Sequence, residues 1–209
     1  MIILGLSYNY HDSAAALVRN GVLVAAAEEE RFSRVKHDSG YPALAIQFCL
    51  DTAGITLEQV DYVVFYEKPF VKLERMLLTA MATFPKSAAV FRESMQRWLT
   101  DKLWIKSQLA SKLGIDTKKI LFCDHHMSHA AASFYTSPFR DAAILTIDGA
   151  GEWTTSTMGV GRDKKIEILK EIRFPHSLGL LYSAFTAYCG FEVNEGEYKL
   201  MGMHPYGQP

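Results

Sequence analysis

Two histidines and an aspartate have the residue types and the spacing of a metal-binding set. His125 and His129 are four residues apart, so on a helix both imidazoles lie on one face and can reach a single ion, while His126 points elsewhere. Asp148 follows at the end of an apolar stretch. Two imidazoles and one carboxylate suit iron(II), zinc(II) or manganese(II). The histidine spacing by itself also fits two surface or core histidines.

Two glycine-containing segments carry groups that could contact a phosphate. Segment 148–152, Asp-Gly-Ala-Gly-Glu, follows the apolar stretch, and glycines let backbone N–H groups approach phosphate oxygens. Segment 195–207 combines three glycines with a lysine and could line a phosphate or base pocket. Read alone, the first segment equally fits an acidic hairpin turn, and the second is expected to be a loop. The candidate cofactor-binding residues are Gly149, Gly151, Lys199 and Gly202.

Two segments near the N-terminus offer proton-transfer and anion-binding groups. His11 beside Asp12 could serve as a general base on a hydroxyl, and a polar turn with a hydrogen-bonded histidine is the alternative. The run 28–38 mixes acidic and basic side chains, of which Arg34 and Lys36 could hold phosphate or carbamoyl oxygens. A solvated loop is the other interpretation of this run.

The elements that position these residues follow from the hydrophobic pattern and the turn signals. Strands are expected at 2–7, 13–19, 22–28, 61–66, 120–123, 142–147, 153–160 and 166–172, and helices at 43–53, 68–113 with a break at Pro85, 125–135 and 176–188. Asn20-Gly21 predicts one hairpin turn, and 161–163 predicts another. The order strand-strand-strand-helix occurs twice. This predicts an α/β protein with the duplicated ATPase-type fold of actin, sugar kinases and Hsp70, in which nucleotide lies between the halves.

The domain organisation is expected to follow this repeat. Residues 1–140 would form a first subdomain, with a basic helical insertion at about 68–119, and 141–209 would begin a second, incomplete one. The insertion contains eleven Lys or Arg and four Asp or Glu, a net charge of +7. Such a charge fits solvated helix faces or a docking surface for a partner or an anionic ligand. The turn-like residues at the C-terminus suggest a fragment of a longer protein, and we expect this fragment to be inactive alone.

The composition is that of a soluble globular protein. The 209 residues are 49% hydrophobic and 22% charged, and the formal net charge of −1 gives no argument for binding nucleic acid or an anionic membrane. Three cysteines without CxxC spacing favour a reducing compartment. The apolar run at the N-terminus is too short for a signal peptide or a membrane span. A cytoplasmic protein is therefore expected.

Five segments, in order, resemble the O-carbamoyltransferases that include the nodulation protein NodU and the cephamycin and tobramycin O-carbamoyltransferases. They are Tyr-His-Asp-Ser-Ala-Ala at 10–15, Glu-Glu-Arg-Phe-Ser-Arg-x-Lys-His-Asp at 29–38, His-His-x-x-His-Ala at 125–130, Asp-Gly-x-Gly-Glu at 148–152, and Gly-Glu-x-Lys-x-Met-Gly-x-x-Pro-Tyr-Gly at 196–207. Together they cover nearly the whole chain, and this ordered set is far more specific than any one segment.

The resemblance implies a reaction and roles for individual residues. Such enzymes join an N-terminal domain related to the tRNA threonylcarbamoyl-transferases to a YrdC-like domain, which makes carbamoyl-adenylate from carbamoyl phosphate and ATP. The N-terminal domain then carbamoylates a hydroxyl of a small molecule or glycan. The resemblance places a divalent metal (iron first, with zinc or manganese as alternatives) on His125, His129 and Asp148. It places the activation of the acceptor hydroxyl on His11, beside Asp12.

Two other functions remain open from the sequence. One is a closer relative of the tRNA-modifying enzymes, for which only the basic segment 68–119 offers a nucleic-acid surface. The other is a non-catalytic fragment that binds nucleotide or a partner. A metalloprotease is a poor fit, because the HExxH pattern requires glutamate where this chain has His126.

Overall fold

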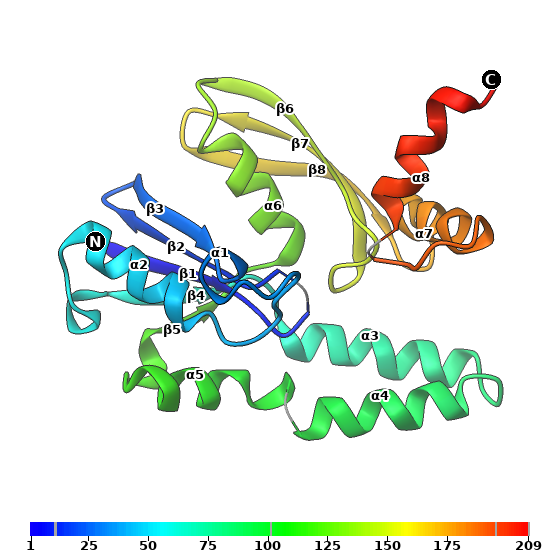
Figure 1. The fold of residues 1–209 in the computed structure, drawn as a ribbon, viewed down its shortest axis with the longest axis horizontal. Helices are drawn as coiled ribbons and strands as arrows, with labels where there is room; N and C mark the ends of the chain where they lie inside the picture. Colours follow the sequence, from blue (N-terminus) through cyan, green and yellow to red (C-terminus); the bar gives the residue numbers. More distant parts are fainter. Residues whose placement is uncertain (11, 101, 195, 209) are drawn as a thin grey trace. The chain divides into compact units, whose positions relative to one another are not determined.

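The structure is a computed structural model that describes residues 1–10, 12–100, 102–194 and 196–208, except for the side chain of Arg97. It divides into two compact units, Met1–His125 and His126–Pro209 (Figure 1). The strands are β1 (Ile2–Ser7), β2 (Ala14–Arg19), β3 (Val22–Glu28), β4 (Tyr62–Phe65), β5 (Ile120–Phe122), β6 (Asp141–Ile147), β7 (Thr154–Arg162) and β8 (Lys165–Arg173). The α-helices are α1 (Glu30–Ser33), α2 (Ala43–Ala53), α3 (Pro69–Ala82), α4 (Ala88–Thr100), α5 (Ile105–Leu113), α6 (His125–Phe134), α7 (Leu178–Tyr188) and α8 (Glu197–Met203). Short 3-10 helices are η1 (Leu57–Gln59), η2 (Lys102–Trp104), η3 (Thr117–Lys119) and η4 (His204–Tyr206).

The first unit is built on a five-stranded mixed sheet with the order β3-β2-β1-β4-β5. β1, β2 and β3 are antiparallel neighbours, whereas β4 and β5 run parallel to β1. The β2–β3 turn has positive φ at Asn20 (53°) and Gly21 (84°), as expected for a tight hairpin. Because β1, β4 and β5 are parallel, the segments that follow them leave from the same edge of the sheet.

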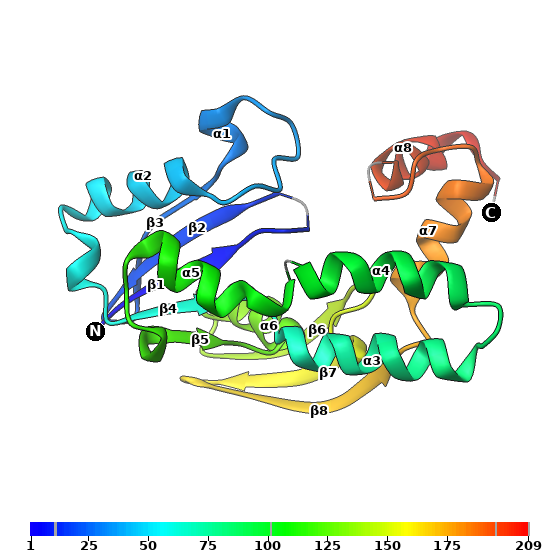
Figure 2. The same cartoon turned by 90° about the horizontal axis from the view of Figure 1, so that it is seen from below.

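One face of this sheet carries the main hydrophobic core. The strand register places alternate apolar residues, among them Leu4, Leu17 and Val63, on the same side. These residues belong to one buried cluster with α2 and α5, to which the helices contribute Ala45, Ile46, Cys49, Leu50, Ile105 and Leu109. Helices α3 and α4 lie side by side as a hairpin (Figure 2). The packing of this core thus holds in place the edge of the sheet from which the segments after β1, β4 and β5 leave.

A buried carboxylate begins helix α2. The Glu29 side chain is 5% exposed and accepts hydrogen bonds from the backbone N–H groups of Leu44 (3.0 Å) and Ala45 (2.7 Å). The first N–H groups of a helix have no partner within the helix, and a negative charge there is stabilising. Glu29 therefore supports α2 and joins the segment 29–38 to the core.

The second unit is built on an antiparallel sheet with the order β6-β7-β8. Helix α6 packs on it through Ala130 and Phe134, which form a small buried cluster with Ile144. A Cβ on Gly161 would lie 2.4 Å from the Phe134 ring, so the glycine makes room for that ring. Helix α7 follows β8 and begins at Ser177, whose Oγ accepts a hydrogen bond from Leu180 N.

The mixed α/β class and the repeated order of elements confirm the predicted fold. β1–β3 and α2 in the first unit correspond to β6–β8 and α7 in the second. The predicted turn at 161–163 lies further along the chain, because β7 continues to Arg162, which pairs with Lys165. The segment 195–207 is expected to be a loop but contains α8. The run 28–38, for which a solvated loop is one interpretation, contains the short helix α1.

The units divide at the first turn of α6, between His125 and His126. The boundary near residue 140 and the insertion at 68–119 remain predictions. Among the described residues, no helix has both the length and the apolar character needed to cross a bilayer.

Candidate metal centre

Helix α6 carries two neighbouring stripes of side chains. His126, Ala130 and Phe134 are buried and recur every four residues, so they form the stripe that packs on the sheet. His125 and His129 each stand one position before a buried residue, and they therefore lie about 100° around the helix axis from the buried stripe. The packing of one stripe therefore determines the direction in which the two candidate ligands point.

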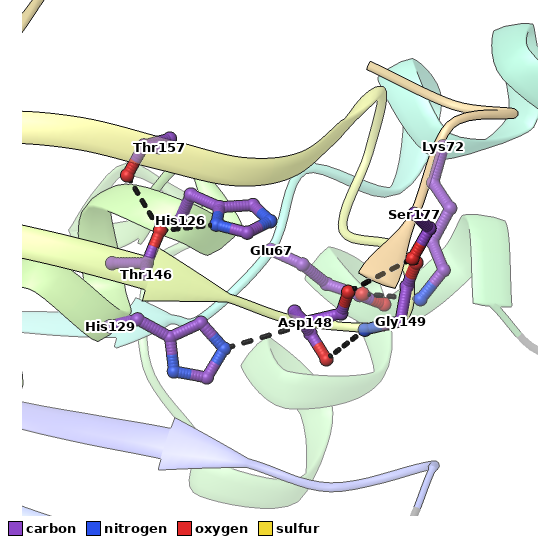
Figure 3. A network of polar contacts seen from close by, with 9 residues as sticks. All are labelled: Glu67, Lys72, His126, His129, Thr146, Asp148, Gly149, Thr157 and Ser177. Carbon is purple, nitrogen blue, oxygen red and sulfur yellow. Dashed lines mark hydrogen bonds and ion pairs between the residues drawn. The ribbon is translucent and has the colours of Figure 1, made fainter. Parts of the chain in front are cut away.

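His125, His129 and Asp148 offer ligand atoms that all lie within 4.8 Å of one another. The distance from His129 Nε2 to Asp148 Oδ2 is 3.6 Å (Figure 3). Two ligands that are each about 2.1 Å from one ion are separated by roughly 3.0 to 3.4 Å in octahedral or tetrahedral geometry, so a small adjustment would suffice. The donor set and its spacing thus fit a divalent transition metal.

The end of β6 holds Asp148 in a defined orientation. Its Oδ1 accepts a hydrogen bond of 2.7 Å from the backbone N–H of Gly149, and its own N–H donates to the Thr155 carbonyl (2.9 Å). The hydroxyl of Ser177 donates to the Gly149 carbonyl (2.6 Å). A Cβ on Gly179 would lie 2.5 Å from the Asp148 carbonyl oxygen, so the first turn of α7 packs directly on this strand end. With Oδ1 engaged in the turn, Oδ2 faces His129.

The two glycines of this turn have backbone partners within the protein. The N–H of Gly149 donates to Asp148 Oδ1, and that of Gly151 donates to the Thr154 carbonyl (3.0 Å). To hold a phosphate, these amides would have to exchange partners. Their role in binding a cofactor stays a prediction.

In the first unit, the structure joins the segments 10–15 and 29–38. The Nδ1 atom of the His37 ring lies 2.9 Å from Asp12 Oδ1. The backbone N–H of His37 donates a hydrogen bond to Glu30 Oε2 (3.0 Å). Asp12, Glu30 and His37 form a second group of metal-ligand type, with ligand atoms within 4.8 Å of one another. His11, the predicted base, lies outside the described residues.

Sequence reasoning gave no role to His37, although it stands within one of the matching segments. Its pairing with Asp12 spans 25 positions and left no local signal. The neighbouring Asp38 is also held in place, because hydrogen bonds from the Ser33 side chain and the Gly40 N–H keep the pKa of its carboxyl below its ordinary value. The loop that carries Arg34 and Lys36 is therefore anchored at its C-terminal end.

The other predicted cofactor-binding residues are exposed. Arg34 and Lys36 lie on the loop after α1, where Arg34 has a left-handed backbone (φ 61°). Lys199 lies on α8 with its ammonium group 5.9 Å from the centre of the Tyr198 ring, and a Cβ on Gly202 would meet no atom within 4 Å. These four assignments stay predictions.

A buried ion pair follows β4 and was not anticipated. Glu67 is 4% exposed, and its Oε2 lies 2.6 Å from Lys72 Nζ on α3 (Figure 3). A buried carboxylate requires such a partner. A glutamate just beyond an apolar strand is the one sequence signal for it.

Comparison with known proteins identifies the family. The sequence model described as the carbamoyltransferase N-terminus matches residues 2–209. The chain belongs to this family. It is 53% identical over 214 residues to an uncharacterized protein of Synechocystis sp., with 99% of this chain and 35% of that protein covered. It is 37% identical over 204 residues to the nodulation protein NolNO of Sinorhizobium fredii, with 95% and 28% covered.

The chain thus spans about a third of the length of these curated relatives. Among solved structures, it is similar to YeaZ from Pseudomonas aeruginosa, with 16% identity, a TM-score of 0.42, and coverage of 83% of this chain and 66% of that one. The fold of this chain is defined by its strand order and by the repeated elements described above.

Proposed function

We propose that this chain supplies the metal-binding and acceptor-activating part of an O-carbamoyltransferase. The observation that carries the proposal is the convergence of His125, His129 and Asp148 within 4.8 Å in a member of the carbamoyltransferase N-terminus family. The reaction moves a carbamoyl group from carbamoyl-adenylate to a hydroxyl of a small molecule or glycan.

The transfer step exchanges one carbon–oxygen bond for another. The acceptor oxygen attacks the carbamoyl carbon, the bond from that carbon to the phosphate oxygen breaks, and AMP leaves with the bonding electrons. A base must take the hydroxyl proton, and His11 is the candidate, beside Asp12, whose carboxylate is held by His37. A metal bound at the cluster would supply positive charge near the leaving phosphate.

The donor would be produced outside the described residues. Carbamoyl-adenylate would come from carbamoyl phosphate and ATP on a YrdC-like domain, present in the same polypeptide or in a separate one. The relatives are about three times longer than this chain, which leaves room for such a domain. We therefore expect the chain to require a supply of carbamoyl-adenylate.

Elemental analysis tests the metal site directly. The purified chain should carry stoichiometric iron, zinc or manganese, and the His125→Ala/His129→Ala double variant should lose it. A matched control is His176→Ala/His204→Ala, which replaces two exposed histidines outside the cluster and should retain the metal. A folded wild-type chain without metal, or a double variant that keeps it, would contradict the assignment.

A transfer assay tests the reaction. The metal-loaded chain would be supplied with carbamoyl-adenylate and a panel of alcohols and oligosaccharides, and the carbamoylated product would be detected by mass spectrometry. We expect no product when the chain alone is given carbamoyl phosphate and ATP. With carbamoyl-adenylate supplied, we expect product that is lost in the His125→Ala/His129→Ala variant. tRNA would be included as a further acceptor, and a carbamoylated tRNA adenosine in place of the other products would favour the tRNA-modifying alternative.

A further inference from the structure

His126 stands between the two candidate ligands but faces the interior. It is 4% exposed, and its Nδ1 atom lies 2.7 Å from the hydroxyl of Thr146 on β6 (Figure 3). The Thr146 hydroxyl lies 2.6 Å from that of Thr157 on β7. Both threonines are also buried, at 6% and 3% exposure. A chain of three buried polar groups therefore links α6 to two strands of the sheet.

This chain of hydrogen bonds lies directly beside the candidate metal ligands. Thr146 lies on β6, and Asp148 directly follows the last residue of that strand. The two-residue alternation of a strand, continued by one position, turns both side chains towards the same face. His126 and His129 are three residues apart on α6, which places them on adjacent turns. The helix and the strand end therefore meet at two places, His126 with Thr146 and His129 with Asp148.

Further along α6, the described contact with the sheet is a small apolar cluster. Ala130 and Phe134 pack with Ile144, Ala142 and Ile166 lie against them, and the ring of Phe134 is over Gly161. Apolar packing has no preferred direction, so such a contact tolerates a small slide or rotation of the helix. Hydrogen bonds, in contrast, require a defined distance and angle. A buried polar group that loses its hydrogen bond has no water molecule to replace the lost partner, which costs free energy.

We propose that the His126–Thr146–Thr157 chain is a positioning network that sets the register of α6 against β6, and through it the spacing of the metal ligands. The inference rests on the proposed metal site. His126 acts here through its neighbours. Its Nδ1 atom is engaged by Thr146, and its ring lies edge to face against that of His129, with the ring centroids 5.9 Å apart.

Thr146→Val tests the network, because it removes the hydroxyl and preserves the shape of the side chain. Co²⁺ serves as the probe, since its visible spectrum reports ligand geometry and its affinity can be measured against a chelator. We expect Thr146→Val to bind Co²⁺ about 10 to 100-fold more weakly and with an altered spectrum. Thr146→Ser, which restores the hydroxyl, should recover both.

Two further variants separate positioning from a general loss of stability. Thr186→Val removes an equally buried hydroxyl, one bonded within α7 to the Tyr182 carbonyl, and should leave Co²⁺ affinity unchanged. Thr157→Val removes the outer link and should cause a smaller loss of affinity, which keeps the test decisive if Thr146→Val does not fold.

The possible failures are distinguishable. A Thr146→Val protein with lower stability but wild-type Co²⁺ affinity and spectrum would overturn the positioning role and leave the metal site intact. Wild-type protein that binds no Co²⁺, or binding that survives His125→Ala/His129→Ala, would overturn the metal site and the network together.

Discussion

At the scale of single residues, the phenol of Tyr8 has an unusual environment. It is 2% exposed, and its hydroxyl has no hydrogen-bond partner among the described residues. Burial, and then the nearby Tyr41, raise the pKa of Tyr8 from 10.0 to about 12. Between these values the folded state keeps a proton that the unfolded state loses. The stability from the neutral phenol is therefore present below about pH 10 and is lost as the pH rises towards 12.

Tyr8→Phe should remove part of this pH dependence. At pH 7 the free energy of unfolding should stay within about 1 kcal/mol of wild type, because the deleted hydroxyl makes no hydrogen bond. Between pH 10 and 12 the variant should lose less stability than wild type, as measured by urea denaturation. Tyr62→Phe, at an exposed phenol, is the control. An unchanged alkaline loss in Tyr8→Phe would refute the assignment.

At the scale of elements, helix α2 depends on a residue outside it. Glu29 accepts the N–H groups of Leu44 and Ala45. Glu29→Gln removes the charge and turns an amide group towards one of these donors, so the free energy of unfolding should fall by about 1 to 2 kcal/mol. Glu28→Gln, at a surface ion pair with Arg31, should change it by less than about 0.5 kcal/mol. Equal effects of the two variants in urea denaturation would argue against a stabilising role of Glu29 at the start of α2.

The contact between α7 and the end of β6 requires a glycine at position 179. Gly179→Ala places a methyl group 2.5 Å from the Asp148 carbonyl oxygen, so α7 or the strand end must move. We expect a loss of about 1 to 3 kcal/mol in stability and weaker metal binding, because Asp148 moves with its backbone.

Gly202→Ala is the matched control for Gly179→Ala. It also places an alanine at a helical glycine, but in open space, and should raise stability by up to about 1 kcal/mol. Calorimetry and metal titration would compare the two variants. A Gly179→Ala protein as stable as Gly202→Ala would show that the contact with Asp148 is not tight.

At the scale of the whole molecule, the two units have cores of different size. The first buries a large cluster of apolar residues from the sheet, α2 and α5, whereas the cluster described for the second consists of Ala130, Phe134 and Ile144. Because buried apolar area is the main source of stability, the second unit should open more readily. The backbone amides of β6–β8 should therefore exchange their hydrogens faster than those of β1 and β4.

Metal binding should reduce this difference between the units. The candidate ligands of the metal join α6 to the end of β6. Saturating metal should therefore slow hydrogen exchange in β6–β8 by the factor that corresponds to the free energy of metal binding. His125→Ala/His129→Ala should show the fast exchange with or without metal. Uniform exchange across both units in the metal-free protein would contradict the expected difference.

The sequence by itself determined the local structure and part of the site. Periodicity and turn residues predicted the helix at 43–53 and the hairpin at Asn20-Gly21, and both are confirmed. The spacing of His125 and His129 was enough to place them on one helical face. These features depend on residues a few positions apart, where the 3.6-residue and two-residue periods relate sequence directly to direction.

Tertiary structure alone decided the contacts between distant segments. The pairing of His37 with Asp12, the engagement of His126 by Thr146, and the close approach of Gly179 to Asp148 each join residues 20 or more positions apart. Such contacts result from strand register and from the packing of helices on sheets, which leave no periodic signal in the chain. The candidate metal ligands could therefore be proposed from the sequence, but the contacts that hold their side chains in position could not.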